Sequence, residues 1–452
     1  MACDKKIVLV GAGSQAFGMK TMASLIWNLD IFDGATICLH DINNEELKRT
    51  KALADVAIKQ LSEIPPEENE MPHGSFKIEA TLNRKEAFEN ADFIVSSIEI
   101  NRYPLWKMDY EVPVALGSTQ IYGENGGPGG FFHACRVIPP VLEIAQDAWD
   151  ICPRAYFFNY TNPMIRVTSA IQRVLPKLRA YGLCHEFLGM RGRIISMWQD
   201  RFGKFIREKF DNYCDMITAG LNHFAFVQKL VDKSTGENLL PDLPSRFRKH
   251  FGASQPLNMY LAERYGQVAY TEDSHSGEYI PWARAISKVY GYNWDEHQKQ
   301  DAKRRADLNA NLARGVDFFW WLERSSERVV DIIKGILTDA MYVEGAINVP
   351  NTNGLLSFLP TDIAVEVPAR IDATGIHGQS ITSIPKGIQG LLRHEAIVSD
   401  LCIEAAISGD KDIALQALLA DGTCSSPEIA EKILKTMLVK QRQYLPQFFK
   451  NT

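Results

Sequence analysis

The segment Lys6-Ile7-Val8-Leu9-Val10-Gly11-Ala12-Gly13-Ser14-Gln15-Ala16 predicts how the N-terminal part of this 452-residue chain folds. Its opening residues are mostly apolar and β-branched, which is typical of a buried strand. The glycines end this strand in a tight turn, and a helix is predicted from Phe17 to Trp27. A strand, a G-x-G-x-x-A turn and a helix in this order are typical of a dinucleotide-binding fold.

The residue types in the turn fit a bound pyrophosphate. Gly11 permits the turn itself, Gly13 lets the backbone approach the ligand, and the small Ala16 permits close packing of strand and helix. Asp41 closes the next predicted strand, where a carboxylate accepts hydrogen bonds from ribose hydroxyls and repels a 2′-phosphate. The alternative is a glycine turn without a ligand and a solvated Asp41. We favour an NAD site, with these cofactor-binding residues: Gly11, Gly13, Ser14 and Asp41.

Further short apolar segments resemble the first strand and are predicted as strands: 35–40, 93–97, 154–158 and 180–184. Helical stretches lie between several of them, which predicts an α/β fold with a parallel sheet covered by helices on both faces. After about residue 196, apolar residues recur at helical spacing over 301–314, 328–341, 387–408 and 427–443. We predict a Rossmann-like NAD-binding domain over 1–195 and a mixed α+β, largely helical C-terminal domain over 196–452.

The composition is that of a globular protein, with 46% hydrophobic and 23% charged residues. The 49 Lys and Arg against 55 Asp and Glu give a net charge of −6 without a dense basic run, which argues against nucleic acid or a membrane surface as partner. No apolar stretch approaches the ~18 residues that cross a bilayer, and the N-terminus lacks the features of a signal peptide. We expect a cytoplasmic protein. Its eight sparse cysteines are expected to be buried thiols, with Cys184 as the exception that serves as a ligand or nucleophile.

Three polar clusters stand out beyond the glycine turn. One is the glycine-dense loop 123–130, and another is Asn159-Tyr160-Thr161-Asn162-Pro163-Met164, which follows a predicted strand. The third pairs Gly182-Leu183-Cys184-His185-Glu186 with Gly220-Leu221-Asn222-His223-Phe224. A thiolate and an imidazole from separate segments hold a divalent metal when substrate oxygens and water fill its other positions. Taken singly, Cys184 fits a buried thiol equally well, and His223 fits a histidine of the core equally well.

Together these clusters resemble glycoside hydrolase family 4, the glycosidases that use NAD and a divalent metal. The resemblance spans nearly the whole chain. It continues through Glu278-Tyr279-Ile280-Pro281-Trp282 and a late stretch from Asn353 to Pro368. It implies a Rossmann-like domain of the lactate/malate dehydrogenase type, NAD and Mn2+ as cofactors, and assembly into a homodimer or homotetramer.

The resemblance also implies a chemistry that differs from the two-carboxylate scheme of most glycosidases. NAD+ removes hydride from C3 of the sugar, and the resulting ketone acidifies the proton on C2. A base takes this proton, the C1 leaving group is eliminated, and water adds to the enone. The nicotinamide then returns the hydride, so the cofactor is recycled in each turnover.

In this family pattern, Cys184 and His223 match the metal-ligand positions. The metal would chelate the C2 and C3 oxygens of the sugar as a Lewis acid. Tyr279 best matches the base, with Tyr270 as a second candidate. Because an unperturbed tyrosine has a pKa of ~10, the cation would have to favour its phenolate. The alternative for Tyr279 is a core aromatic.

His185 directly follows the cysteine, where some family members carry an Asp that resembles a general acid. A histidine with a pKa of ~6.5 is also able to protonate a departing glycosidic oxygen near neutrality. Asn162 and Glu124 match substrate-contacting positions. Glu124 equally fits a partner that orients a ligand.

The Cys-His-Glu and Glu-Tyr-x-Pro-Trp motifs resemble the α-galactosidase and α-galacturonidase branch of the family. We therefore expect an α-linked galacturonide, galactoside or glucoside as substrate. Among these we favour the galacturonide, whose sugar is a uronate. A uronate carboxylate favours a bidentate arginine. Three candidates lie near the motif loops: Arg102, Arg136 and Arg166.

Two other functions compete with this interpretation. An NAD-dependent 2-hydroxy-acid dehydrogenase of the lactate or malate type shares the glycine turn and an Asn-Pro after a sheet strand. Such an enzyme needs a His-Asp pair and an Arg clamp, and Gly375-Ile376-His377-Gly378-Gln379 comes too late in the chain to supply them. A binding protein that retains NAD without catalysis is the other alternative, and intact Cys184, His223 and Tyr279 argue against it.

Overall fold

The computed structural model describes residues 3–14, 17–63, 74–203, 209–315 and 327–450. Their first half contributes parallel strands: β1 (Lys6–Val10), β2 (Thr36–His40), β3 (Lys77–Thr81), β4 (Phe93–Ser96), β5 (Tyr156–Asn159) and β6 (Arg179–Gly182). All of the predicted strands are present, which confirms the α/β prediction. The sequence pattern does not predict β3, because its residues are exposed or half-buried at the sheet edge and form no apolar run.

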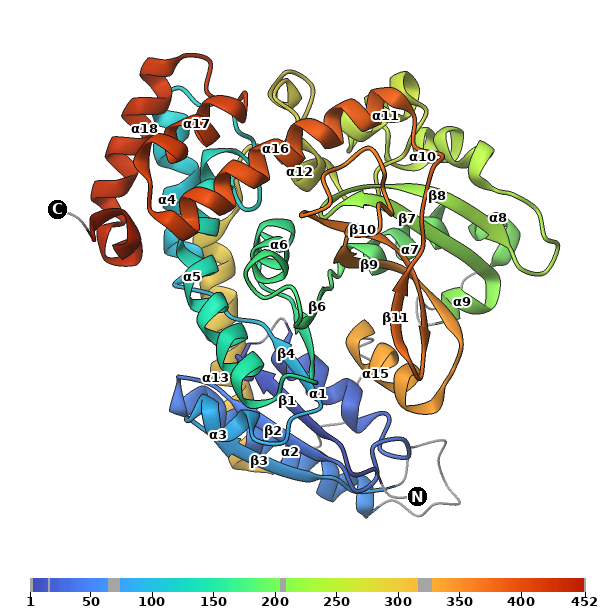
Figure 1. Cartoon of the computed structure of the whole chain (residues 1–452). Helices are drawn as coiled ribbons and strands as arrows, with labels where there is room; N and C mark the ends of the chain where they lie inside the picture. Colours follow the sequence, from blue (N-terminus) through green and yellow to red (C-terminus); the bar gives the residue numbers. More distant parts are fainter. Residues whose placement is uncertain (1–2, 15–16, 64–73, 204–208, 316–326, 451–452) are drawn as a thin grey trace.

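The second half of the chain extends the same sheet with antiparallel strands: β7 (Cys214–Leu221), β8 (Phe224–Asp232), β9 (Tyr342–Pro350), β10 (Ala364–Asp372) and β11 (Gly375–Gly378). The order is β3-β2-β1-β4-β5-β6-β9-β10-β7-β8, and β11 pairs with β10 (Figure 1). A single backbone pairing, Gly182 with Asn348, joins β6 to β9. The division near residue 195 stays a prediction.

Helices surround the sheet. Those before β7 are α1 (Gly18–Ile26), α2 (Asn44–Ser62), α3 (Arg84–Phe88), α4 (Arg102–Ala115), α5 (Gly127–Ile151), α6 (Met164–Val174), α7 (Glu186–Met197), α8 (Gln199–Phe202) and α9 (Phe210–Tyr213). Those after β8 are α10 (Leu243–Phe251), α11 (Pro256–Tyr265), α12 (Asp273–Ser276), α13 (Trp294–Arg314), α15 (Arg328–Thr338), α16 (Lys386–Ser408), α17 (Lys411–Ala420) and α18 (Pro427–Lys440). Short 3-10 turns are η2 (Leu240–Asp242), η3 (Gly277–Tyr279), η4 (Ala283–Ala285), η5 (Arg442–Tyr444) and η6 (Pro446–Phe449).

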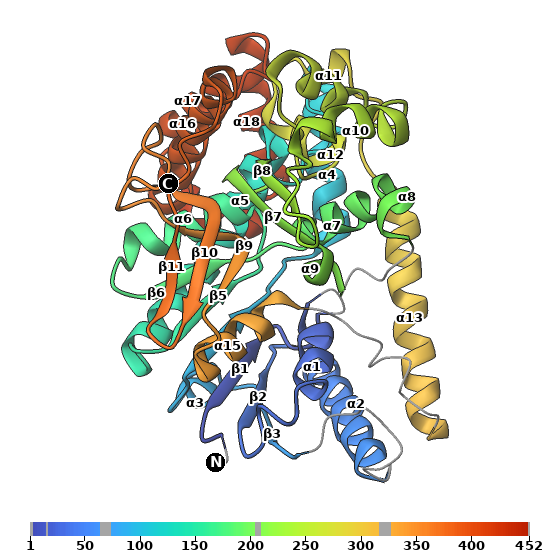
Figure 2. The ribbon, with the colours of Figure 1, turned by 90° about the vertical axis from the view of Figure 1, so that its right-hand side faces the viewer.

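The predicted helices are present, but two of them end early. The helix predicted over 427–443 ends at Lys440 and is followed by the 3-10 turn η5. The helix predicted over 328–341 ends at Thr338, because Asp339 adopts a left-handed backbone with a φ of 51° and the chain then enters β9. Figure 2 shows α13 as a long helix beside α2. In the described part of the chain, none of the helices combines the length and apolarity of a membrane span.

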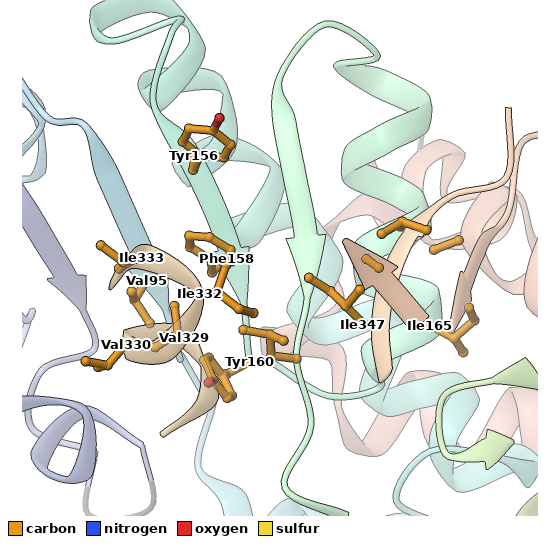
Figure 3. Packing of buried hydrophobic residues seen from close by; sticks show 14 of the residues in the cluster. Val95, Tyr156, Phe158, Tyr160, Ile165, Val329, Val330, Ile332, Ile333 and Ile347 are labelled. Carbon is orange, nitrogen blue, oxygen red and sulfur yellow. The ribbon is translucent and has the colours of Figure 1, made fainter. Parts of the chain in front are cut away.

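Alternate residues of β1 pack on opposite faces of the sheet, as a doubly covered sheet requires. Ile7 and Leu9 belong to one buried cluster, and Val8 and Val10 belong to another. Figure 3 shows the apolar side of α15 in the first cluster, where it places Val329, Val330, Ile332 and Ile333 beside Val95 and Phe158. The second cluster joins α5 and α6 to the C-terminal helices α16 to α18.

All eight cysteines lie within the described residues and are free thiols, and all but Cys3 are buried. This confirms the expectation of buried thiols.

A buried ion pair fastens α4 to α5. Arg136 donates hydrogen bonds to the Asp109 carboxylate at 3.0 and 2.6 Å and to Gln441 Oε1 at 2.7 Å. Arg136→Met leaves Asp109 charged without its cation, so we expect the free energy of unfolding to fall by about 3–5 kcal/mol. Urea midpoints test this. The double variant with Asp109→Leu should recover much of the loss, and an unchanged midpoint in the single variant would contradict the analysis.

Candidate active site

The predicted cofactor-binding residues lie together at the ends of β1 and β2. Gly11 has a φ of +76°, and a Cβ there would meet the Ser97 carbonyl oxygen at 2.3 Å. The Gly13 N–H donates to Asp41 Oδ2 at 2.9 Å, and a Cβ on Gly13 would lie 2.4 Å from Glu46 Cβ. The Ser14 N–H donates to the Gly11 carbonyl at 2.9 Å. Ala16 lies outside the described residues. The bare backbone beside a carboxylate fits a dinucleotide cradle.

Cys184 and His223 follow the ends of β6 and β7, and both are buried. They approach each other through Asn222, whose side chain hydrogen-bonds the Cys184 thiol and which is joined to His223 by a cis peptide bond. Burial raises the pKa of the Cys184 thiol and lowers the pKa of the His223 imidazole well below its ordinary value. A neutral imidazole is the form that binds metals.

This pair has the chemistry of a partial metal site. The buried His223 Nδ1 has no hydrogen-bond partner among the residues that the structure describes. Within the same residues, no three His, Cys, Asp or Glu side chains converge on one point. A sulfur and an imidazole nitrogen alone would leave the other positions of a cation to substrate oxygens and water, as in a catalytic metal site.

His275 stacks on His223, with ring centroids 4.6 Å apart. Its Nδ1 lies 3.1 Å from Glu278 Oε2. Burial disfavours its charge, but the hydrogen bond and the charge of Glu278 raise the pKa of His275 to about 9. The other oxygen of Glu278 accepts hydrogen bonds from the backbone of the glycine-dense loop: from Glu124 at 2.6 Å, Asn125 at 2.7 Å and Gly126 at 3.3 Å. One carboxylate therefore joins this loop to the Cys184–His223 pair.

Glu124 is buried, and its carboxylate receives a hydrogen bond from Arg102 at 2.6 Å. Burial opposes its charge, but Arg102 holds the pKa of Glu124 below its ordinary value. Asn162, the other residue matched to substrate contact, is half-buried between β5 and α6. Its neighbour Thr161 is bonded to the Ile98 backbone at 3.0 and 3.1 Å, which fixes the turn that presents Asn162.

His185 lies between the cofactor turn and the Cys184–His223 pair. Its ring stacks on Phe17 with centroids 4.5 Å apart, and Phe17 directly precedes α1 of the glycine turn. On the other side, His185 Nε2 is 2.8 Å from both oxygens of the buried Glu327. A carboxylate in this position fixes the orientation of the ring.

Both tyrosine candidates are buried beside the pair. Tyr279 accepts a hydrogen bond from the His223 backbone N–H at 3.3 Å and stacks on Phe224. Tyr270 accepts a hydrogen bond from the Asn222 side chain at 2.9 Å and donates to Glu366 Oε2 at 3.2 Å. Burial raises the pKa of each phenol well above its ordinary value.

Sequence reasoning missed His275, Glu278, Glu327 and Glu366 as members of this site. For Glu366 a signal existed, because a carboxylate inside a buried strand needs hydrogen-bond partners, which here include Asn222 and Asn348. His275 and Glu278 carried a weaker signal, since they precede the motif tyrosine. Glu327 carried none, because its contact with His185 crosses 142 positions of sequence.

Comparison with known proteins identifies the class. The model for family 4 glycosyl hydrolase matches residues 6–199, and that for its C-terminal domain matches 218–424. An alpha-glucosidase of Erwinia rhapontici is 33% identical over 97% of this chain and 98% of that protein. An alpha-galacturonidase of Lachnoclostridium phytofermentans is 25% identical over 98% of this chain and 97% of that protein. The chain is a glycosidase. It belongs to family 4 of the glycosyl hydrolases.

Solved structures share its fold. A 6-phospho-alpha-glucosidase from gut microorganisms, in complex with NAD and Mn2+, gives a TM-score of 0.81 at 19% identity, covering 98% of this chain and 100% of that chain. Malate dehydrogenase of Cryptosporidium parvum gives a TM-score of 0.52 at 12% identity, and the match covers 90% of this chain and 100% of that chain. The prediction of a Rossmann-like fold of the malate dehydrogenase type is confirmed.

The role of Glu278 generates a test. Glu278→Ala removes the acceptor of three backbone N–H groups, so amide hydrogen exchange over 124–126 should accelerate by at least about tenfold. Mass spectrometry of the peptide that covers this loop measures the change. Glu278→Gln retains an oxygen acceptor and should keep most of the protection. Glu428→Ala, at an exposed ion pair on α18, is the control. Unchanged exchange in Glu278→Ala would refute the assignment.

Proposed function

We propose that this glycosidase hydrolyses α-linked glycosides with bound NAD and a divalent cation, Mn2+ in the first place. The stacking of His185 on Phe17 carries the proposal, because it brings the cofactor turn next to the Cys184–His223 pair. The alpha-glucosidase relative and the similar structure solved with NAD and Mn2+ support it. The reaction would run by oxidation at C3, elimination across C1 and C2, addition of water and re-reduction.

Bound NAD would supply an acceptor for the hydride from C3 of the sugar. Bound Mn2+ would supply a Lewis acid for the C2 and C3 oxygens. Gly11, Gly13 and Ser14 would hold the pyrophosphate through their backbone. Asp41 would accept hydrogen bonds from the ribose hydroxyls. The metal would be held by Cys184 and His223. Nδ1 of His223, which has no partner among the described residues, is the ligand atom that fits.

The chain's own acid and base act on either side of the bond that breaks. His185, held in place by Glu327, would donate a proton to the departing glycosidic oxygen. Tyr279 would accept the proton from C2, with Tyr270 as the second candidate. Burial works against either phenolate, so the base needs the positive charge of the metal close by. Glu124 and Asn162 would contact the sugar hydroxyls.

The substrate would be an α-glucoside, α-galactoside or α-galacturonide, the last named for the 25% identical relative. A lactate- or malate-type dehydrogenase shares only the fold with this chain, whereas family membership extends over both halves. The cytoplasmic location, the homo-oligomer and the domain boundary near 195 stay predictions.

The metal assignment predicts a selective loss of binding. Cys184→Ser and His223→Ala should each weaken Mn2+ binding by at least about 100-fold, because each removes one of two protein ligands. Isothermal titration with Mn2+ measures this loss. The NAD+ affinity, measured in the same way, should change by less than about threefold, because the glycine turn is a separate segment. Cys3→Ser, at a half-buried thiol, is the control. Wild-type Mn2+ affinity in either site variant, or full turnover in EDTA, would disprove the assignment.

The elimination mechanism predicts isotope exchange. Turnover in D2O should place deuterium at C2 of the released sugar, because the proton removed from C2 is replaced from solvent. Displacement at C1 would place none there. NMR of the product decides between the two. Tyr279→Phe should lower exchange and turnover together, with Tyr270→Phe as the matched comparison. If exchange survives in Tyr279→Phe but is lost in Tyr270→Phe, the base is Tyr270. If the wild-type product carries no deuterium at C2, the elimination mechanism is wrong.

A further inference from the structure

We infer that Glu327 and Arg328, at the start of α15, are positioning residues that hold Cys184 and His185 in place for metal binding and proton donation. The inference rests on the proposed function, in which Cys184 is a metal ligand and His185 the general acid. Two contacts between neighbouring residues carry it: Glu327 binds the His185 ring, and Arg328 binds the Cys184 carbonyl. We name these four residues the α15 brace.

The Cys184-His185 segment lies between two elements of secondary structure. β6 ends at Gly182 and α7 begins at Glu186, so the Cys184 carbonyl lies outside the hydrogen bonds of both elements. Cys184 is buried, and a buried carbonyl needs a hydrogen-bond partner. Nη1 of Arg328 provides it, at 3.0 Å from the carbonyl oxygen. The backbone that carries the proposed metal ligand is therefore fixed by a side chain from α15.

Arg328 is itself fixed by two neighbours. Its Nε and Nη2 donate to Glu344 Oε1 at 3.1 and 2.7 Å, and its guanidinium lies over the Phe187 ring, 4.8 Å from the centroid. Burial disfavours the charge of Arg328, but Glu344 offsets this effect and raises the pKa of the guanidinium. A charged donor forms a stronger hydrogen bond than a neutral one. Through this planar group, Arg328 connects the Cys184 backbone to β9 and α7.

Glu327 is directed at His185 and not at its own helix. It occupies the N-cap position of α15, which Ser, Thr, Asp and Asn usually fill because their side chains cap the first turn. In the described part of the chain, the Glu327 carboxylate makes no such cap. Both of its oxygens lie 2.8 Å from His185 Nε2. The Glu327 side chain is 4% exposed and that of His185 is 32% exposed, so a buried carboxylate supports a ring that stays accessible.

This contact determines how the His185 ring is presented. Because Nε2 faces Glu327, Nδ1 on the other edge of the ring is the nitrogen that remains for the glycosidic oxygen. Phe17 stacks on the same ring, with centroids 4.5 Å apart, and limits its rotation. A carboxylate bonded to one ring nitrogen fixes the orientation of a catalytic histidine in the same way. Glu327 thus acts through His185 and needs no contact with the sugar.

The α15 brace also contacts the helix that follows the glycine turn. The Glu327 N–H donates to Ser24 Oγ of α1 at 3.1 Å. Phe17, which stacks on His185, directly precedes the same helix. The start of α15 therefore joins the acid and the metal-ligand segment to the cofactor-binding part of the chain. Groups that act on one bound sugar need such fixed relative positions.

Metal binding tests Arg328 without any turnover. Arg328→Lys keeps a positive charge beside Glu344 but loses the planar fork that also reaches the Cys184 carbonyl. We expect the Mn2+ affinity of the full-length chain, measured by isothermal titration, to fall by about 10- to 100-fold. The NAD+ affinity should change by less than about threefold, which also verifies folding. Wild-type Mn2+ affinity in Arg328→Lys would overturn the role of Arg328.

Two further variants support this measurement. Arg201→Lys is the matched control, because Arg201 also binds a carboxylate, that of Asp232, at the opposite end of β8 from His223. It should leave both affinities unchanged. If Arg328→Lys does not bind NAD+, Glu344→Gln replaces it, because it weakens the support of Arg328 and keeps an acceptor. We then expect the Mn2+ affinity to fall by about three- to tenfold, and an unchanged affinity would again overturn the role of Arg328.

Leaving groups test Glu327. A misplaced acid matters most when the departing oxygen needs a proton. In the enzyme loaded with NAD+ and Mn2+, Glu327→Ala should therefore lower kcat/KM for a methyl α-glycoside at least about tenfold more than for the 4-nitrophenyl α-glycoside of the same sugar. Glu327→Gln retains an acceptor for the ring and should recover most of this difference. Equal losses for both substrates in Glu327→Ala would indicate a merely structural role and contradict the inference.

A double-mutant cycle tests whether Glu327 acts through His185. In a His185→Ala background, Glu327→Ala should change kcat/KM by less than about twofold, because the ring that it positions is already absent. A further large loss would overturn the role of Glu327. The Mn2+ titrations separate this inference from the proposed function. A selective loss of Mn2+ affinity in Arg328→Lys supports the α15 brace even if no α-glycoside is cleaved, which would refute the proposed function alone. Absence of Mn2+ binding in the wild type would refute both.

Discussion

The site depends on one buried carboxylate, that of Glu278. It accepts three backbone hydrogen bonds from a loop too rich in glycine to hold its own shape, and its second oxygen holds His275 against His223. Charge-assisted hydrogen bonds of this kind are stronger than neutral ones, and the buried charge would be costly without them. The loop between α4 and α5 and the segment around α12 and η3 are therefore held in one arrangement, although more than 150 positions separate them in sequence.

A second junction joins the cofactor turn to the catalytic residues. His185 is stacked on Phe17 and bonded to Glu327, so one ring touches the beginning of α1 and the segment before α15. The proposed reaction uses a hydride acceptor at C3 and a proton donor at the oxygen on C1 of the same sugar, so both groups must lie close together. The parallel strands provide it, since the ends of β1, β5 and β6 lie along the same edge of the sheet.

Local signals predicted much of this protein. The buried strand, the glycine turn and Asp41 follow from residue spacing, because their contacts are short-range or set by parallel strand order. The motif residues Cys184 and His223 could be chosen by residue type, and their proximity rests on the pairing of β7 with β10 and of β6 with β9. Partners such as Glu327 and His275 were not predictable, because nothing in their own segments specifies what lies across the site. The edge strand β3 was missed for a simpler reason, its lack of an apolar run.

The distribution of charge follows from the same chemistry. In the proposed reaction a divalent metal and a cationic nicotinamide occupy one site, and both must be stabilised away from bulk water. Carboxylates placed around that site, including Glu124 and Glu278, supply opposing charge. Arginines beside them are correspondingly paired, as Arg102 and Arg193 are. Glu124 pairs with Arg102 and also faces His275, so the carboxylates that would balance the bound cofactors also hold the cationic side chains of the site in place.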